Sequence, residues 1–424
     1  MEIFDPLYGK FELEQISKNL CILPEVRRLS QIRLLNSITP TLATLSELRR
    51  YAHTLGVIHL FTLWKKAAGR RFAKADVDAL EVAIILHDIA TPPFGHLFEY
   101  VLKDSLGWDH ESAAVSALLK AYGPASTGQQ IFAGRTPKVL DYVERSGIDL
   151  DKVKSILSKK HILSGLIFGV VDFDNLDNVW RMSWALGLPE ARGEGPEALA
   201  QCLDVSADGG LRITSGGAPL LRKWASLRRR VYEVLIFDQS TIASQTLLTY
   251  AIKTGIARGL ISPDDWFLHD ESLLLKLSAD KELRELIERQ YLGQLPLPVL
   301  TVQIQWREAP FFTLARSEIE KISRESVEHI LGTATWLYAF KEKGSFEKEV
   351  HYVDTDGAAQ RLGETSRSIV VSIFSDRLLS SQQSRAVSQA FLEMLTSHDI
   401  SSSDLLQVIV SGKSGNPSNA RFDF

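Results

Sequence analysis

Apolar residues recur at three- and four-residue spacing through most of the first three hundred positions, and this periodicity predicts α-helices. The clearest helical segments are ALEVAIILHDIA at 79–90, HESAAVSALLKAYG at 110–123 and STIASQTLLTYAIKTGIARGL at 240–260. Proline and glycine interrupt this pattern locally, in TPPFG at 91–95 and in VSADGGLRITSGGAPL at 205–220. The second of these interruptions predicts a short hairpin or a loop.

The pattern changes after about residue 295. Four later segments are rich in β-branched and aromatic residues and predict strands: 297–306, 334–343, 348–354 and 368–376. Residues 381–395 return to a helical period. We therefore expect a mainly α protein, with a large helical domain over 1–295 followed by a smaller α+β region over 296–424. The second region is expected to serve oligomerisation or regulation.

Composition excludes several classes of protein. The chain has 424 residues and a net charge of −4, so no global basic field is available to hold nucleic acid. Cys21 and Cys202 are the only cysteines, too few for a disulfide framework or a thiolate metal site. No run approaches the ~20 apolar residues of a membrane span, and the mixed, acidic start is unlike a signal peptide. We expect a soluble cytoplasmic protein with no membrane partner.

Candidate chemistry gathers around histidines that lie beside acidic residues: His53, His87, His96 and His110. His87 and Asp88 close an apolar helical segment and are followed at once by Thr91-Pro92-Pro93, so both side chains can enter one cleft. Imidazole nitrogen and carboxylate oxygen together suit a divalent cation. Two ligands do not complete such a site, and the sequence offers His53 and an aspartate within 170–181 as further candidates.

An ordered series of segments resembles the HD-domain deoxynucleoside triphosphate triphosphohydrolases, the family of bacterial dGTPases and of the mammalian SAM-and-HD protein. One HD dipeptide is a weak motif, but the series extends over some 230 residues in the family's order. The matching segments are FDPLYGKFELE at 4–14, LRRYAHTLGV at 48–57, LHDIATPPFGH at 86–96, WDHE at 108–111 and SLRRRVYE at 226–233.

The resemblance implies a set of metal ligands: His53, His87, Asp88 and Asp174. Asp174 is preferred to Asp172 because the family's ligand is the second aspartate of this segment. Asp172 and Asp177 are expected to act as a helix N-cap or a salt-bridge partner. The implied cofactor is a divalent ion, either manganese, iron, magnesium or zinc, which activates a water and polarises a phosphoryl oxygen.

The resemblance also implies catalytic and substrate-binding residues. His96 is the expected proton donor to the leaving oxygen, and His110 with Glu111 is expected to share that work. The expected substrate contacts are Arg50, Asn178, Tyr232, Arg229 and Arg230. Arg50 would meet phosphate, Tyr232 would pack under the sugar, and Arg229 and Arg230 would add phosphate contacts.

Several positions depart from the family's pattern. Asn175 stands where the family has a phosphate-binding lysine, and Asn178 where it has a sugar-contacting tyrosine. Further departures are Leu34, Thr91 and Met182. Because the metal positions persist while sugar-reading positions change, these differences favour an altered substrate preference, or an activity that depends on assembly, over an inactive protein.

The resemblance therefore implies hydrolysis of a dNTP to deoxynucleoside and triphosphate, by a homo-oligomer (dimer, tetramer or hexamer) that can bind a second, allosteric nucleotide. Antiviral defence by dNTP depletion follows by analogy alone. Two alternatives stay open. One is an HD-type nuclease or phosphodiesterase acting on single-stranded or cyclic nucleotides, which the net charge disfavours. The other is a nucleotide-sensing regulatory subunit with little turnover.

Overall fold

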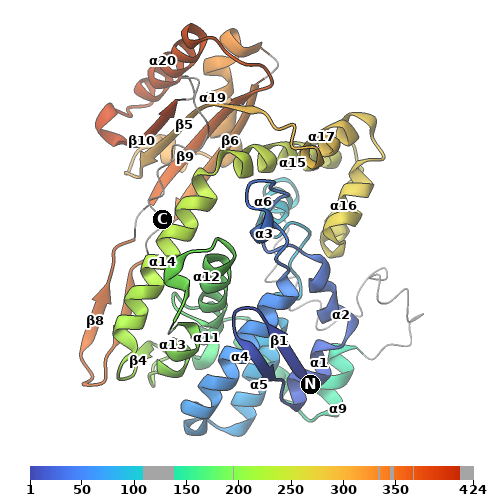
Figure 1. Ribbon diagram of the computed structural model, residues 1–424, viewed down its shortest axis with the longest axis vertical. Coiled ribbons are helices and arrows are strands. Elements are labelled where there is room, and N and C mark those ends of the chain that lie inside the picture. Colours follow the sequence, from blue (N-terminus) through green and yellow to red (C-terminus); the bar gives the residue numbers. More distant parts are fainter. Residues whose placement is uncertain (108–137, 194, 333–334, 344–347, 366, 411–424) are drawn as a thin grey trace.

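The computed structural model describes residues 1–107, 138–193, 195–332, 335–343, 348–365 and 367–410. Helices dominate, and a smaller α+β part lies at one end of an elongated molecule (Figure 1). The expected mainly α class with a C-terminal α+β part is therefore confirmed. In the part of the chain described here, no helix is long and apolar enough to cross a membrane.

The helices up to residue 291 form the larger part, and each follows an apolar periodicity in the sequence. Their bounds are α1 Gln15–Cys21, α2 Pro24–Arg27, α3 Ala43–Ser46, α4 Arg50–Ala67, α5 Lys74–Leu86, α6 His96–Leu106, α9 Val139–Arg145, α10 Leu150–Leu157, α11 Gly165–Phe168, α12 Phe173–Ala185, α13 Pro196–Cys202, α14 Gly217–Phe237, α15 Gln239–Ala257, α16 Asp270–Leu277 and α17 Lys281–Tyr291. The helices expected at 79–90 and 240–260 correspond to α5 and α15, although α5 ends at Leu86. The helix expected at 110–123 lies outside the described residues.

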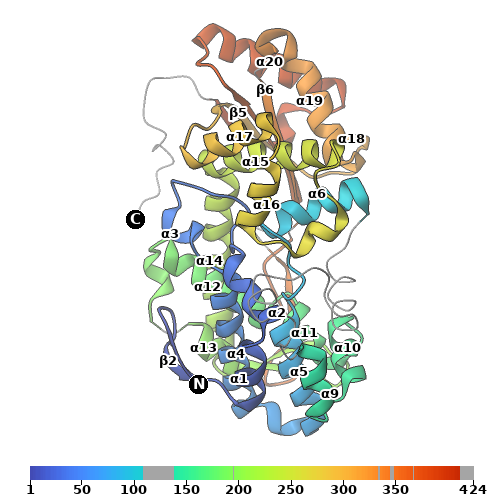
Figure 2. The same ribbon diagram turned by 90° about the vertical axis from the view of Figure 1, so that its right-hand side faces the viewer.

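The main hydrophobic core lies between α4, α5, α12 and α14, where buried residues such as Phe61, Trp64, Trp180 and Trp224 pack together. A second cluster joins α6 to α15, α16 and α17 and lies between the main core and the C-terminal sheet (Figure 2). The segment that links α5 to α6 therefore passes from one cluster to the other.

The C-terminal part is built around one antiparallel four-stranded sheet in the order β10-β5-β9-β6. Its strands are β5 Leu297–Gln305, β6 Thr335–Lys343, β9 Arg367–Ser375 and β10 Leu405–Val410. The helices on one face are α18 Pro310–Thr313, α19 Arg316–Leu331 and α20 Ser381–Ser397. The opposite face packs on α15, where Tyr338 and Phe374 meet Ile242. Strands expected at 297–306, 334–343 and 368–376 are therefore present, whereas β10 was not anticipated.

Three hairpins complete the fold, and one of them connects the two parts. The strands are β1 Glu2–Asp5, β2 Gly9–Glu12, β3 Leu203–Val205, β4 Leu211–Ile213, β7 Val350–Val353 and β8 Ala359–Leu362. The β3–β4 hairpin lies where the sequence predicts a short hairpin or a loop, at 205–220. The β7–β8 hairpin, which includes the strand expected at 348–354, runs back beside α14 and pairs with β4 (Figure 1). Val350 is buried in the main helical core, so a C-terminal segment becomes part of the helical domain.

Candidate metal centre and its surroundings

Two crossing helices, α4 and α12, bring His53 and Asp174 together. Gly56, one turn after His53, lies directly against α12, because a Cβ at this position would stand 1.8 Å from Asp177 Oδ1. The close approach of the two helices therefore depends on a residue without a side chain. Across this contact His53 Nε2 lies 2.8 Å from Asp174 Oδ1.

His87 and Asp88 approach the same point from the end of α5. His87 is the C-cap residue, and its Nδ1 lies 2.6 Å from the carbonyl oxygen of Ile84. Nδ1 must donate this hydrogen bond, so the other ring nitrogen, Nε2, has a free lone pair in the neutral form. Nε2 is buried and has no hydrogen-bond partner within the described ranges. An acceptor buried in this way is suited to binding a cation.

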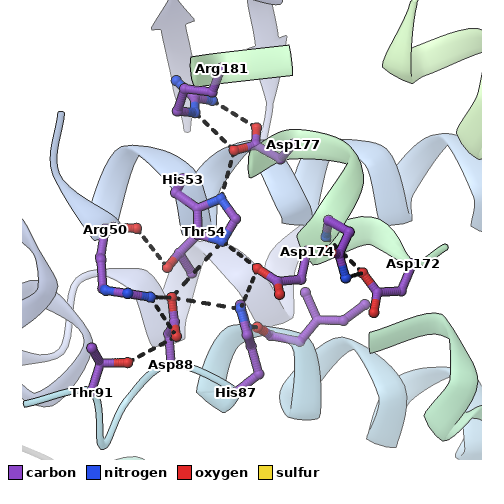
Figure 3. Close-up of polar contacts among 12 residues, drawn as sticks. Arg50, His53, Thr54, His87, Asp88, Thr91, Asp172, Asp174, Asp177 and Arg181 are labelled. Carbon is purple, nitrogen blue, oxygen red and sulfur yellow. Dashed lines mark hydrogen bonds and ion pairs between the residues drawn. The ribbon is translucent and has the colours of Figure 1, made fainter. Parts of the chain in front are cut away.

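All four expected ligands converge (Figure 3). His87 Nε2 lies 3.6 Å from Asp174 Oδ1 and 3.7 Å from Asp88 Oδ2, and His53 Nε2 lies 3.9 Å from the same Asp88 oxygen. One donor atom from each of His53, His87 and Asp88 lies within 4.8 Å of the other two. Ligands bonded at ~2.1 Å to one ion are separated by roughly 3–4 Å. His53, His87 and Asp88 therefore fit a single divalent cation, and Asp174 lies against both histidines as a fourth candidate ligand.

The buried histidines and aspartates of this cluster shift one another's pKa values. Burial disfavours the charged imidazolium of His53, but hydrogen bonds to Asp174 and Asp177 outweigh burial and raise its pKa to about 10. Burial also opposes the charge on His87, yet the negative charges of Asp88 and Asp174 raise its pKa. The pKa of Asp174 is lowered despite burial, by the two histidines. A proton shared between His53 and Asp174 thus offsets part of the negative charge of the buried carboxylates.

Asp177 holds the His53 ring in place and was not anticipated in this role. Its carboxylate is fully buried and accepts a bond from His53 Nδ1 at 2.7 Å, from Tyr8 Oη at 2.8 Å and from two nitrogens of Arg181. Arg181 also donates to Asp5, on the β1–β2 hairpin. The sequence did predict Asp177 as a salt-bridge partner, which is confirmed. The contact to His53 requires that Nε2 faces the cluster.

Asp172 caps α12, as the sequence predicts, because it accepts the backbone N–H of Asn175 at 2.7 Å. Its carboxylate is buried beside that of Asp174, and both burial and this neighbouring charge raise its pKa. Asp174 therefore lies nearest the histidines while Asp172 fixes the start of the helix.

Arg50 is placed differently from the expected phosphate contact. Its buried guanidinium donates from Nη1 to both oxygens of Asp88, at 3.0 and 2.9 Å. Thr91 donates to the same carboxylate at 2.9 Å. Burial raises the pKa of Asp88, but Arg50 and the two histidines lower it below its usual range. In this structure Arg50 orients a candidate ligand.

His96 begins α6 at the edge of this cluster. The preceding turn is tight, with positive φ values of 55° at Phe94 and 54° at Gly95. A Cβ at Gly95 would lie 2.8 Å from Arg50 Nη2, so the turn packs against the arginine that holds Asp88. The His96 side chain is 56% exposed, and its Nδ1 lies 2.9 Å from Glu99 Oε2. His110 and Glu111 lie outside the described residues.

The two arginines of α14 that were expected to bind phosphate form ion pairs. Arg229 pairs with Glu233, and Arg230 pairs with Glu190, both at the surface. Arg228 is instead the buried arginine, and it lies over the Tyr232 ring at 4.5 Å. The helical period already separates Arg228 from its two neighbours, since it places Arg228 on the buried face with Leu221 and Trp224. The helical period thus identifies Arg228, and neither Arg229 nor Arg230, as the buried arginine of this segment.

Asn178 lies on α12, one residue after Asp177. Its Oδ1 is buried without a hydrogen-bond partner among the described residues. A sugar contact by Asn178 remains a prediction, because nothing in the geometry assigns this oxygen a ligand.

Comparisons with known proteins agree with this geometry. Residues 50–140 match the HD domain family. The deoxynucleoside triphosphate triphosphohydrolase SAMHD1 of Danio rerio is 28% identical over 125 residues, covering 27% of this chain and 20% of that protein. The chain thus spans about a fifth of the length of the curated relatives it matches first.

Solved structures extend the likeness of the fold to most of the chain. A phosphohydrolase from Bacteroides thetaiotaomicron has a TM-score of 0.63 at 16% identity, over 88% of this chain and 99% of that one. A hypothetical protein from Aquifex aeolicus has a TM-score of 0.66 at 16% identity, over 91% and 99%. Residues 50–140 therefore carry an HD domain, and most of the chain shares its fold with these solved structures.

Proposed function

We propose that the protein is a metal-dependent nucleotide phosphohydrolase whose substrate is a dNTP, cleaved to deoxynucleoside and triphosphate. The observation that carries this proposal is the cluster of His53, His87 and Asp88, with Asp174 of a third helical segment against the two histidines. The substrate class is suggested by the relatives named as deoxynucleoside triphosphate triphosphohydrolases.

These four side chains would hold the divalent ion. When bound, the ion lowers the pKa of a water molecule and polarises a phosphoryl oxygen. The chain's own contribution is to orient the ligands: Asp177 fixes the ring of His53, and Arg50 fixes the carboxylate of Asp88. Both partners are themselves buried and hydrogen-bonded, so the ligands are held before any substrate arrives.

Cleavage adds the hydroxyl of water to the α-phosphorus and breaks its bond to the 5′-oxygen, which then needs a proton. His96 would donate it, since its ring is accessible at the N-terminus of α6 and Glu99 can hold Nδ1. The nucleoside then leaves with a free 5′-hydroxyl, and the three phosphates leave together.

We expect His96→Ala to lower kcat by about a hundredfold or more, the usual range for loss of a general acid, while the bound metal is retained. Turnover and metal content of the purified variant measure the two effects separately. Loss of the ion in this variant would assign His96 to metal binding instead.

The function is tested by incubating the metal-loaded protein with each dNTP, NTP, dNMP and a short single-stranded DNA, and separating the products by chromatography. Each reaction is repeated with a second nucleotide present as an activator. Release of triphosphate from a dNTP supports the proposal, whereas shortened DNA indicates a nuclease. Binding without turnover in every combination indicates a nucleotide-sensing subunit.

Metal affinity should rise with pH. In the metal-free protein the pKa of His53 is about 10, so the ring carries an extra proton at pH 7 to 9 that coordination must remove. Asp88 and Asp174 have lowered pKa values and release no proton in this range. We expect the apparent affinity to increase up to about tenfold per pH unit for each proton displaced. Calorimetric titration in buffers of different ionisation enthalpy counts these protons, and a count of zero would contradict the prediction.

A further inference from the structure

Arg228 is a buried cation that pairs with no carboxylate among the residues that the structure describes. Its side chain is 3% exposed and lies over the ring of Tyr232, and its Nη1 donates to Asn175 Oδ1 at 3.1 Å. Within the described ranges no carboxylate pairs with this guanidinium, and its Nε has no hydrogen-bond partner. Burying a charge without a counter-charge is costly, so a guanidinium in this state is suited to an anionic ligand.

The position of Arg228 relates it to the candidate metal centre. Asn175, which accepts its bond, directly follows Asp174 in α12, and Asn175 Nδ2 donates to Asp172 at 3.0 Å. The side chain that accepts from Arg228 is thus that of the residue after the candidate ligand Asp174, and this contact joins α14 to α12. A phosphate chain attached to a group at the metal could extend in this direction.

A second cation reaches the same place from the C-terminal part of the chain. Lys348 lies two residues before Val350, which is buried in the helical core as β7 begins. The pairing of Val353 with Arg212 holds this hairpin beside α14 (Figure 1). Gly363, on the other side of the hairpin, would bring a Cβ within 3.2 Å of the Lys348 carbonyl oxygen, so the hairpin base is tightly packed.

The half-buried Lys348 amine is close enough to Arg228, Asp172 and Asp174 to interact with each electrostatically. Burial and then Arg228 lower the pKa of this amine, and the two carboxylates oppose that change. No hydrogen bond or ion pair fixes the amine to any of the residues that the structure describes. Two cations thus share one region at the edge of the cluster, and an anion between them would relieve their repulsion.

We infer that Arg228 and Lys348 form an oligophosphate subsite, which binds the anionic end of the substrate beyond the phosphate at the metal. This inference rests on the proposed function and deepens it. Since Lys348 belongs to the 296–424 region, the C-terminal part completes the substrate site of the helical domain. A substrate with one phosphate would gain nothing from this subsite.

The probe is inorganic tripolyphosphate, with Mg²⁺ in excess so that chelation leaves the centre loaded. Its Kd is measured by calorimetry for the wild-type protein, Lys348→Met, Lys348→Arg and Arg361→Met. Arg361 lies on the same hairpin and pairs with Glu349 at the surface, so its variant removes one cation elsewhere. We expect Lys348→Met to weaken binding about tenfold, the effect of one charge-assisted contact, and both other variants to stay near wild type. Arg228→Lys, which keeps the charge of the buried residue, is expected to weaken binding by a similar factor because the planar fork is lost.

The subsite is overturned if Lys348→Met binds tripolyphosphate with wild-type affinity, or if Arg361→Met loses as much affinity as Lys348→Met. It is also overturned if the wild-type protein does not bind tripolyphosphate. The assay needs no cleavage, so it separates this inference from the proposed function. Tripolyphosphate binding with these effects but without nucleotide cleavage supports the subsite and refutes the function. Cleavage with an unchanged KM for dNTP in Lys348→Met supports the function and refutes the subsite.

Discussion

Replacing His87 by alanine is expected to remove the bound divalent ion and to lower phosphohydrolase turnover by about a thousandfold or more. Its Nε2 is the buried acceptor that faces Asp88 and Asp174 without any other partner in the described structure, so the variant deletes one side of the cation site. A metal ion contributes several kcal/mol to phosphoryl transfer, and ~1.4 kcal/mol corresponds to tenfold in rate. Elemental analysis of the purified variant and a turnover assay with added metal measure the two losses.

His351→Ala is the matched control, because His351 is a surface histidine that pairs only with Glu349 among the described contacts. Its metal content and turnover should equal those of the wild-type protein. If His87→Ala kept both metal and activity, the centre would have to lie elsewhere. Asp88→Ala is a less specific test, because it also leaves the buried guanidinium of Arg50 without its carboxylate.

Local features of the site could be predicted from the sequence. The apolar run before His87-Asp88, and the prolines after it, predict a helix that ends at the pair, and α5 does end there. Asp172 follows a simple capping rule. The convergence of His53 and Asp174 on that pair did not follow from periodicity, because they are 121 residues apart. It came from the resemblance to a family, and their actual contact depends on the approach of α4 and α12 at Gly56.

Contacts between elements that are far apart in the sequence could not be predicted from hydrophobic periodicity or composition. The resemblance implied that Arg50 contacts the substrate, but in the fold its partner is Asp88, which comes from the end of another helix. Lys348 occurs in a segment that reads only as a strand, and its neighbours depend on a hairpin that returns to the helical core. Short strands such as β1, β8 and β10 were missed for a related reason, since each is defined by its pairing partner more than by its composition.

The contact between Asp177 and His53 leads to the second large expected effect. We expect Asp177→Asn to weaken metal affinity by about 10- to 100-fold, although Asp177 is no ligand. The aspartate carboxylate holds the Nδ1–H of His53 at 2.7 Å and makes the ring a better electron donor at Nε2. An asparagine oxygen accepts the bond but carries no charge, and it also leaves Arg181 with Asp5 as its one remaining carboxylate partner in the described structure. Competition with a metal-sensitive dye measures the affinity.

Asp172→Asn is the control on the same helix. Asparagine caps helices as well as aspartate does, so the start of α12 should be kept and metal affinity should change little.

Asp177→Asn should also lower the free energy of unfolding by about 3 kcal/mol, since a buried ion pair is broken on one side. The loss of stability and the loss of metal affinity can be told apart by measuring affinity under conditions where the variant is folded. A variant that is only less stable binds metal with wild-type affinity there. If the folded Asp177→Asn protein bound metal as tightly as the wild type, Asp177 would serve stability alone, and the orientation of His53 would have to come from Asp174 and the packing of α4.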